Sequence, residues 1–433
     1  MHILNFDLSK KCGAFKLLNA VNNGPCFNRF ATQQKRSNFE LYKAARIPFA
    51  RNHDAAHFSG YGGEHAVDIS AIFPNFDNDP YNEASYDFAC TDEYVLKTLM
   101  AGTKTFYRLG QKIEHYIVKY NVHPPKNFKK WAVICEHIIR HYTQGWANGF
   151  EYDMPYWEIW NEADLGDAST WTGAKEQFFD LYETAAKHLK GCFPHLKIGG
   201  PALGWNEEWA SEFLTEMKKR EVPIDFFSWH IYRPEVKPII DKSERIKKLL
   251  IDNGYENAES ILNEWNYVKS WDADDFVQNS VVITGIKGAC FTLAMMCASQ
   301  NSTIDMLMYY DARPSTFNGL FDYYTFKPLK GYYPFLWYGM FYDMAYEIKC
   351  EDSYADIYTL CGVDKDGKTL SVVTYYTDKE NEAEIKEIKV DFNKDAEYEI
   401  YLLDKDHDAE LVKETSGLSF KIEPNSAILI KEK

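Results

Sequence analysis

The chain has 433 residues, of which 45% are hydrophobic and 16% are aromatic, and its formal net charge is −16. This length allows one large domain and one small domain, and the apolar share is enough for a sizeable core. Such an acidic chain, which carries no basic stripe, disfavours nucleic acid and anionic membranes as partners.

The N-terminus and the cysteines bear on where the protein works. Residues 1–7 do not form a basic segment followed by an apolar one, so the sequence predicts no signal peptide. The longest apolar run, 288–299, is too short to span a membrane. The nine cysteines show no CxxC spacing, which favours free thiols. We therefore expect a cytoplasmic protein with no nucleic-acid or membrane partner, and association into a homo-oligomer stays open.

Short apolar runs alternate with longer amphipathic runs from residue 15 to about residue 345. The short runs predict strands at 15–21, 47–53, 104–109, 156–162, 196–201, 224–232, 260–265 and 305–310. The longer runs predict helices at 34–45, 92–101 (with Asp92 as N-cap), 128–144, 173–190, 207–220, 236–253, 277–300 and 332–344. Eight strand–helix units indicate the α/β class and a (β/α)8 barrel. A doubly wound sheet is the alternative, but 19–25 is not its glycine-rich phosphate turn.

The pattern changes after residue 345. Alternating short strands are predicted at 357–361, 370–376, 385–392, 397–403 and 427–431. The segment 364–367 is a hairpin signal. The predicted division is therefore a segment 1–14 that joins a β domain, a barrel at 15–345, and a small antiparallel β-sandwich at 346–433.

A long polar and aromatic connection occupies residues 54–92. Connections of this length inside a compact domain are usually functional or disordered. The aromatic residues and the apolar piece 67–73 favour an ordered loop that covers a site.

Polar residues end several of the predicted barrel strands. Because barrel enzymes act at the carboxyl ends of their strands, these residues are the candidates for chemistry. They are Arg51, His53, Asn161, Glu162, His230, Tyr232, Glu264, Asn266, Tyr310 and Asp311. Strand alternation predicts one shared face for Glu158, Trp160 and Glu162, and another for Leu262, Glu264 and Asn266.

Glu162 and Glu264 end the fourth and seventh strands. Two carboxylates across a cleft suit cleavage of a glycosidic bond, because one must be a protonated acid and the other must be ionised. A single glutamate at a strand end is more often salt-bridged or solvated, but this pair, each beside an asparagine and near a tryptophan, favours chemistry. Glu158 lies roughly 13 Å deeper than Glu162 along the strand, and we interpret it as a structural carboxylate.

The neighbouring candidates have predicted supporting roles. Tyr232 would orient Glu264 by a hydrogen bond, and Arg51 would favour its ionised form. His230 would contact Glu162 or a sugar hydroxyl, and Asn161 would bind a sugar hydroxyl. A second cluster, formed by His53, Asp54, His57 and His65, matches no standard zinc spacing. A metal hydrolase therefore ranks below a glycosidase, and we expect no metal and no cofactor.

Two segments carry a family resemblance. Residues 157–162 (WEIWNE) and 261–266 (ILNEWN) resemble the acid/base and nucleophile strands of clan A retaining glycoside hydrolases, in particular family 39, which includes β-xylosidases and α-L-iduronidases. Residues 21–25, 51–53 and 228–232 and the terminal β domain agree with it. The resemblance implies that Glu162 is the acid/base and Glu264 the nucleophile. It also implies that Arg51, His53, Asn161, His230 and Tyr232 line the subsite of the cleaved sugar. Trp265, Tyr310 and Asp311 are further substrate-binding candidates.

The chain also departs from the family. Trp265 stands where a phenylalanine is expected, strand eight ends in Tyr310–Asp311 in place of a tryptophan, and the loop 54–92 is distinctive. The predicted function is a retaining exo-glycosidase of β-xylosidase type that acts on an oligosaccharide or glycoside, with carboxyl groups about 5–5.5 Å apart. Arabinosides, galactosides, glucosides or uronides as substrates, transglycosylation, and a non-catalytic carbohydrate-binding protein remain as alternatives.

Overall fold

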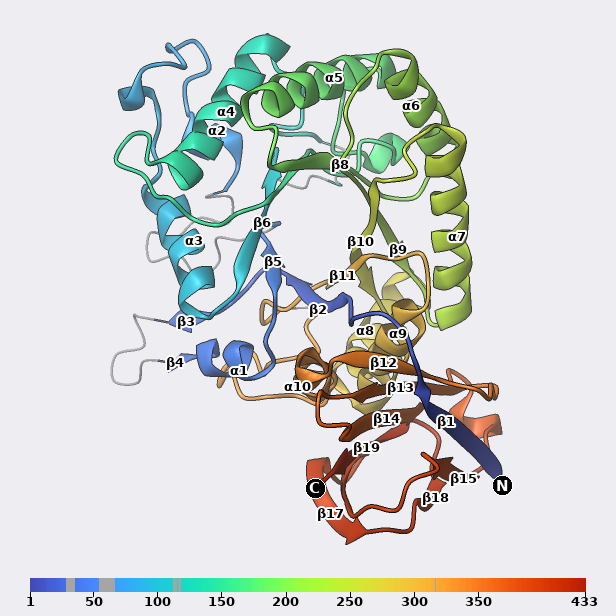
Figure 1. Ribbon diagram of the computed structural model, residues 1–433. Helices are drawn as coiled ribbons and strands as arrows, with labels where there is room; N and C mark the ends of the chain where they lie inside the picture. The colour runs from blue at the N-terminus through green and yellow to red at the C-terminus, as the bar shows by residue number, and fades with distance from the viewer. Residues whose placement is uncertain (29–35, 54–66, 112–114, 116–117, 316) are drawn as a thin grey trace.

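The computed structural model describes residues 1–28, 36–53, 67–111, 115, 118–315 and 317–433. Its centre is a closed barrel of eight strands, seen in the upper part of Figure 1. In order around the barrel, these are β2 (Leu17–Asn22), β5 (Phe49–Arg51), β6 (Lys104–Leu109), β7 (Tyr156–Ile159), β8 (Lys197–Leu203), β9 (Phe226–Tyr232), β10 (Glu259–Asn266) and β11 (Met306–Tyr309). Every neighbouring pair is parallel. The predicted (β/α)8 fold is confirmed.

Helices surround the barrel. They are α1 (Phe39–Ala44), α2 (Ile69–Ile72), α3 (Ala89–Met100), α4 (Phe128–Gln144), α5 (Lys175–Cys192), α6 (Glu207–Lys219), α7 (Val236–Asp252), α8 (Ala273–Thr284), α9 (Ile286–Gln300) and α10 (Tyr332–Met340). A short hairpin of β3 (Phe27–Asn28) and β4 (Arg36–Ser37) lies outside the barrel sheet. The bounds of α4 match the prediction because its ends carry clear signals. The Asn127 side chain accepts a hydrogen bond from the backbone N–H of Lys130 at 3.0 Å, and Gly145 ends the helix with φ 70°.

Two helix predictions were wrong in detail. The predicted helix at 277–300 is two helices, α8 and α9, which meet at Gly285 and are bent by 73°. Glycine is a poor helix former, so a break there costs little. Asp92 is not the N-cap of α3, which begins at Ala89. Its carboxylate instead accepts hydrogen bonds from His141 and from the Tyr142 hydroxyl. No single helix in the described parts of the chain is long and apolar enough to cross a membrane, and only α8 and α9 together reach that length and composition.

The lower part of the barrel is filled by apolar side chains. This cluster contains Ala20, Phe49, Phe106, Tyr156, Phe226, Ile261, Met306 and Met308. Above it, toward the carboxyl ends of the strands, the interior becomes polar. There Arg51 Nε donates to Glu158 Oε2 at 2.6 Å, and Asn263 Nδ2 donates to Glu158 Oε1 at 2.6 Å. Arg51, Glu158 and Asn263 are all fully buried, so this group forms the base of the cavity described below.

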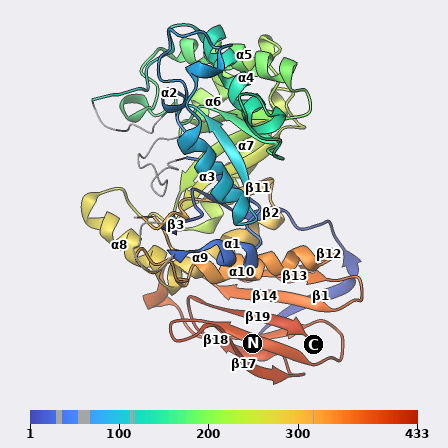
Figure 2. The same ribbon diagram turned by 90° about the vertical axis from the view of Figure 1, so that its left-hand side faces the viewer.

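A curled sheet of nine strands forms a second unit below the barrel (Figures 1 and 2). In chain order it contains β1 (His2–Lys11), β12 (Tyr346–Cys350), β13 (Ile357–Val363), β14 (Thr369–Tyr375), β15 (Lys386–Asp391), β16 (Tyr398–Leu403), β17 (Asp408–Thr415), β18 (Ser419–Ile422) and β19 (Ser426–Glu432). Side chains from β1, β13, β14, β15, β16 and β19 share one core. The sheet is mixed, because β1 pairs in parallel with β15, whereas the sequence predicted antiparallel pairing throughout.

Helix α9 connects the two units. Figure 2 shows it between the barrel and the strands β13 and β14. Leu360, Val372 and Leu429, from the outer face of the sheet, belong to the same core cluster as the barrel helices. The sheet therefore covers one side of the barrel, and the segment after β14 reaches the residues that follow β9 and β10, where Tyr376 contacts Pro234 and Asp378 contacts Tyr267.

We expect Glu158→Ala to lower the free energy of unfolding by about 3–5 kcal/mol, because breaking a buried ion pair leaves the charge of Arg51 poorly compensated. Denaturant unfolding of both proteins would measure the loss. The matched control is Glu212→Ala, which removes a surface pair with Lys175 and should leave stability unchanged within error. Equal losses in the two variants would contradict a structural role for Glu158.

Candidate active site

A cavity of about 620 Å³ opens at the carboxyl ends of the barrel strands. Glu162 and Glu264 both line it, and both are at least nine-tenths buried. An oxygen of Glu162, an oxygen of Glu264 and a ring nitrogen of His230 lie within 4.8 Å of one another. The remaining lining residues are His53, His115, Leu165, Ala168, Gly204, Trp205, Ile231, Tyr232, Arg233, Trp271, Tyr310 and Phe317. The two glutamates predicted from strands four and seven therefore meet in one cavity.

Glu264 is surrounded by hydrogen-bond donors. Arg51 Nη1 donates to Oε1 at 2.8 Å, and the Tyr232 hydroxyl donates to Oε2 at 2.9 Å. His53 Nε2 lies 3.1 Å from Oε1. Burial raises the pKa of Glu264, and nearby Glu162 adds to the rise, whereas Arg51 and the Tyr232 hydrogen bond act against it. The donors thus offset part of the cost of burying the ionised carboxylate, and the pKa stays above its ordinary value.

His53 is held as a neutral imidazole. Burial lowers its pKa well below the ordinary value, and the positive charge of Arg51 lowers it further. Arg51 Nη1, which can only donate, lies 3.0 Å from His53 Nδ1. The proton of the neutral ring is therefore on Nε2, the nitrogen that faces Glu264.

Glu162 has different partners. His230 Nδ1 lies 2.8 Å from Oε1, and His115 Nε2 lies 3.3 Å from Oε2. Burial lowers the pKa of His230 to about 4, so this ring is neutral at physiological pH. Glu162 thus faces two imidazoles, whereas the fixed charge of Arg51 lies against Glu264. The two carboxylates are in electrostatically distinct surroundings, as acid/base chemistry by a pair requires.

The directions of these two carboxylates are set by irregular local backbone geometry. The regular alternation of side chains along a strand does not account for them. Trp160 and Glu162 have φ values of 69° and 47°, in the left-handed region that residues other than glycine rarely adopt. As a result β7 ends at Ile159, and Trp160 turns outward to contact Trp131 and Trp171. The prediction that Trp160 shares a face with Glu162 was wrong for this reason.

A bulge has the same effect on β10. The register of this strand shifts between Leu262 and Glu264. Leu262 packs with the outer core, whereas Asn263 and Glu264 both reach into the barrel. The predicted common face of Leu262 and Glu264 was therefore wrong. Bulges of this kind are frequent beside active sites, where they redirect a side chain.

Asn161 is anchored on one side only. Its Oδ1 accepts a hydrogen bond from Arg51 Nη2 at 2.6 Å, and its Nδ2 has no partner among the described residues. A buried amide N–H without an acceptor is costly, so this group suits a ligand hydroxyl.

The structure brings some predicted residues to the cavity and not others. Tyr310 lines it and lies edge-on to His53, with 5.6 Å between the ring centroids. Trp265 is fully buried behind the barrel wall, where it packs against Phe291 and Tyr309, so its predicted contact with substrate has no support in this position. Asp311 is also fully buried and accepts a hydrogen bond from Asn23 at 3.0 Å, outside the cavity lining.

Asn266 supports the wall of the cavity through hydrogen bonds to the backbone. Its Nδ2 donates to the backbone oxygens of Tyr310 and Phe317. Asp54, His57 and His65 lie outside the described residues, as does the part 54–66 of the loop predicted to cover the site. The described part of that loop, 67–92, contributes no residue to the cavity lining.

Several cavity residues were missed because they lie on loops. No periodic pattern places these residues, which are His115, Trp205, Trp271 and Phe317, because each lies in a loop after the end of a barrel strand. One signal was available for Trp205. Asp164, just after the Trp-Asn-Glu segment, accepts backbone N–H bonds at 2.8 Å from Gly204, Trp205 and Asn206. A buried aspartate after a catalytic strand indicates that it fixes a neighbouring loop.

Among the described residues, two groups of side chains have donor atoms close enough to hold a metal ion. The first is Glu162, His230 and Glu264. Arg51 contacts Glu264 directly, and a guanidinium in that place repels a divalent cation. The second is Glu136, His188 and Cys192, between α4 and α5 on the outside of the barrel. There Arg140 already donates to Glu136 at 2.7 Å, which weakens it as a metal ligand in the same way.

The family model for glycosyl hydrolases family 39 matches residues 24–282. The chain belongs to glycosyl hydrolase family 39. A β-xylosidase of Geobacillus stearothermophilus is 32% identical to this family 39 chain over 179 residues, which are 38% of the chain and 34% of that enzyme. A β-xylosidase of Caldicellulosiruptor saccharolyticus is 34% identical over 139 residues, 32% of the chain and 26% of that enzyme. The match thus spans about a third of the length of these relatives, or less.

Solved structures resemble the whole chain. A glucosidase from Croceicoccus marinus has a TM-score of 0.79 and 20% identity, and the alignment covers 100% of this chain and 99% of that one. A monomeric β-xylosidase from Caulobacter crescentus has a TM-score of 0.71 and 15% identity, with 100% and 99% covered. At these identities the likeness shows the fold that the family 39 chain shares with them.

We expect Glu264→Gln to make the protein more stable relative to wild type as pH rises. Because burial raises the pKa of Glu264, the folded state holds its proton more tightly than the unfolded state. Wild type therefore loses stability as pH rises from the ordinary glutamate range through the raised pKa, and the glutamine variant lacks this loss. Thermal unfolding from pH 4.5 to pH 8 measures the difference in melting temperature, which should grow toward pH 8. A difference that stays constant or shrinks would count against the raised pKa.

Proposed function

We propose that the protein is a retaining glycosidase that acts by double displacement. Glu162 protonates the glycosidic oxygen while Glu264 attacks the anomeric carbon and forms a covalent glycosyl–enzyme ester. Glu162 then removes a proton from water, which attacks the anomeric carbon and frees Glu264 and the sugar. The reaction needs no cofactor.

The observation that carries the proposal is the short gap between two buried, differently surrounded carboxylates. Their nearest oxygens lie within 4.8 Å, whereas an inverting enzyme keeps its carboxyl groups about 6.5–9.5 Å apart to admit a water molecule. The neighbours fit the assigned roles. Arg51 and Tyr232 favour an ionised nucleophile, and the neutral His230 leaves Glu162 free to exchange a proton.

The substrate class is proposed from the family and the relatives. Both relatives named above are β-xylosidases, so a β-xyloside is the first candidate for the cleaved unit. Arg51, His53, Asn161, His230 and Tyr232 are proposed to bind that unit, and the free Nδ2 of Asn161 supplies a hydrogen bond to one of its hydroxyls. Tyr310 and Trp271 add aromatic surface at the mouth. We also propose a cytoplasmic location, which is supported by nine cysteines that form no disulfide bond with one another.

Aryl glycosides test the substrate directly. We expect release of nitrophenol from the β-xyloside, with the α-arabinofuranoside, β-galactoside, β-glucoside and β-glucuronide as comparisons. Cleavage of another member of the set would correct the sugar and keep the reaction. Transfer of the sugar to added alcohols in preference to water would indicate a transglycosylase. If all of these compounds and short oligosaccharides stay intact while still binding, the chain is a carbohydrate-binding protein.

Removal of each carboxylate should give a different defect. Glu264→Ala is expected to abolish turnover, whereas Glu162→Ala should lose about 10²–10⁴-fold with poor leaving groups and less with activated ones, which need no acid. Added azide should rescue Glu264→Ala with an inverted glycosyl azide, because it attacks in place of the carboxylate. In Glu162→Ala azide attacks the ester, and the product should retain configuration. Proton NMR of the products distinguishes the two. Full activity in either variant would refute the proposed roles.

A further inference from the structure

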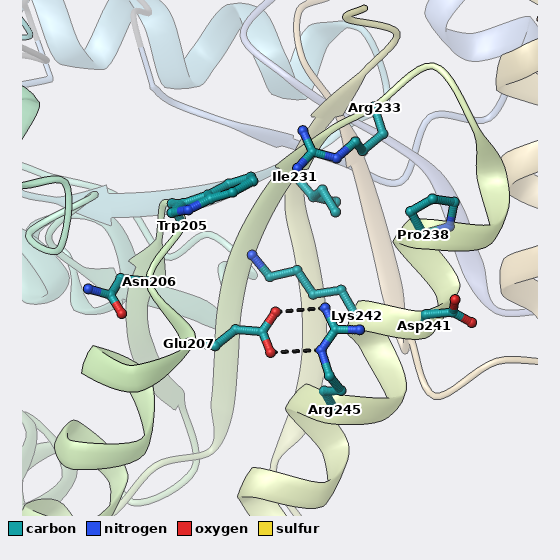
Figure 3. Close-up of a pocket in the computed structure, with 9 residues that line it drawn as sticks. All are labelled: Trp205, Asn206, Glu207, Ile231, Arg233, Pro238, Asp241, Lys242 and Arg245. Carbon is teal, nitrogen blue, oxygen red and sulfur yellow. Dashed lines mark hydrogen bonds and ion pairs between the residues drawn. The ribbon is translucent and has the colours of Figure 1, made fainter.

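A second cavity of about 600 Å³ adjoins the active site (Figure 3). It is lined by Trp205, Asn206, Glu207, Ile231, Arg233, Pro238, Asp241, Lys242 and Arg245. Three of these residues, Trp205, Ile231 and Arg233, also line the first cavity. The two cavities therefore adjoin at these three residues.

The second cavity is on the side of Glu162. Asp164, two residues after Glu162, holds the loop of Trp205 through three backbone hydrogen bonds. A Cβ atom on Gly204, next to Trp205, would lie only 3.2 Å from Glu162 Cγ. If Glu162 is the acid that protonates the leaving oxygen, as proposed above, the sugar that leaves lies toward this second cavity.

Two cations of the second cavity, Lys242 and Arg233, form no salt bridge with a carboxylate of the described residues. Lys242 is only 3% exposed. Its one hydrogen bond to the described residues goes to the backbone oxygen of His230, at 3.1 Å. Within the described parts of the chain, Arg233 donates a hydrogen bond only to the Tyr232 backbone oxygen. Both cations also lie over the Trp205 ring, with the Arg233 guanidinium 4.7 Å and the Lys242 ammonium 5.7 Å from its centroid. In Figure 3 the Lys242 ammonium points toward the space beside Trp205.

The acidic residues of this cavity are already paired. Glu207 accepts two hydrogen bonds at 2.8 Å from Arg245, drawn as dashed lines in Figure 3. Asp241 pairs with Lys237 at 2.7 Å. Lys242 and Arg233 thus form no ion pair with a carboxylate of the described residues, although Glu207 and Asp164 lie near enough to Lys242 to act on its charge, in a protein whose net charge is −16.

A purely structural role for these cations explains only part of the arrangement. Stacking on Trp205 would help to hold its loop, and Arg233 alone would suffice for that. It does not explain a buried ammonium that makes one hydrogen bond to the described residues and otherwise faces the Trp205 and Trp229 rings. Burial lowers the pKa of Lys242 to about 8, although Glu207 and Asp164 act to raise it, so the buried charge still lacks full compensation. An anion in the cavity would supply that compensation.

We propose that the second cavity binds a leaving-group sugar that carries an anionic substituent, either the carboxylate of a uronate or a sulfate. The anion would accept hydrogen bonds from Lys242 and Arg233, and the sugar ring would contact Trp205, which is 56% exposed. The statement that this sugar is the leaving group rests on the proposed function. The site for an anionic sugar rests on the cavity and its unpaired cations.

Binding measurements test the site without requiring catalysis. Calorimetric titration of the wild-type protein would use three matched probes: methyl β-D-glucuronide, methyl β-D-glucoside 6-sulfate and neutral methyl β-D-glucoside. We expect at least one anionic probe to bind about tenfold more tightly than the neutral one, since it gains charge-assisted hydrogen bonds. The stronger of the two identifies the anion. Equal affinity for all three would overturn the proposal.

Variants place the preference in the second cavity. Lys242→Met keeps the side-chain length and removes a buried, unpaired charge, so it should fold at least as stably as wild type. It should also lose the preference, as should Arg233→Gln on the partly exposed loop. Lys242 is the more specific of the two, because it lines only the second cavity. The control, Lys248→Met, removes an exposed lysine of the same helix and should keep the preference. A preference that survives in both test variants would refute the assignment.

The outcomes also separate this inference from the proposed reaction. Cleavage of neutral glycosides without any anion preference would refute the anionic subsite and leave the glycosidase intact. An anion preference that depends on Lys242, in a protein that cleaves no glycoside, would refute the reaction and leave the subsite.

Discussion

One buried guanidinium holds the active site together. Arg51 donates to Glu158 at the base of the cavity, to Asn161 on the fourth strand and to Glu264 on the seventh. A planar group with five N–H donors can satisfy several acceptors in fixed directions, which a lysine cannot do. The positions of the carboxylates are therefore set from within the barrel. Because Glu158 compensates the charge of Arg51 from below, Glu264 can change its charge during a reaction without leaving the cation unpaired.

The barrel was predictable because its signals are local. Apolar runs of strand length alternate with amphipathic runs, and caps such as Asn127 mark helix ends, so the number and order of the units follow from the sequence. Strand β17 was missed because its side chains are largely exposed at the edge of the sheet and show no apolar alternation. The parallel pairing of β1 with β15 was missed because it depends on contacts between distant parts of the chain.

The sequence predicted which residues belong to the candidate site, but it did not predict the directions of their side chains. Glu162 and Glu264 follow from strand counting together with the rule that barrel chemistry lies at strand ends. Their directions did not follow, since they depend on positive φ values near Glu162 and on a bulge before Glu264. Strained or irregular backbone positions do not follow the alternation of side chains along a strand, and such positions are concentrated beside functional sites. Trp205 and Lys242 belong to a loop and a helix, whose approach to the cavity is decided by tertiary packing.

The first strand has a consequence for how the protein can be assembled. Lys11 pairs with Ile348, and His2 pairs with Ile388, so β1 lies between strands from the far end of the chain. During synthesis the ribosome must release the entire barrel before either edge of β1 finds its partner, and unpaired edges invite association with other chains. Fusion partners or truncations that disturb the last ninety residues or so would leave this early strand exposed, even though they are far from both glutamates in the sequence.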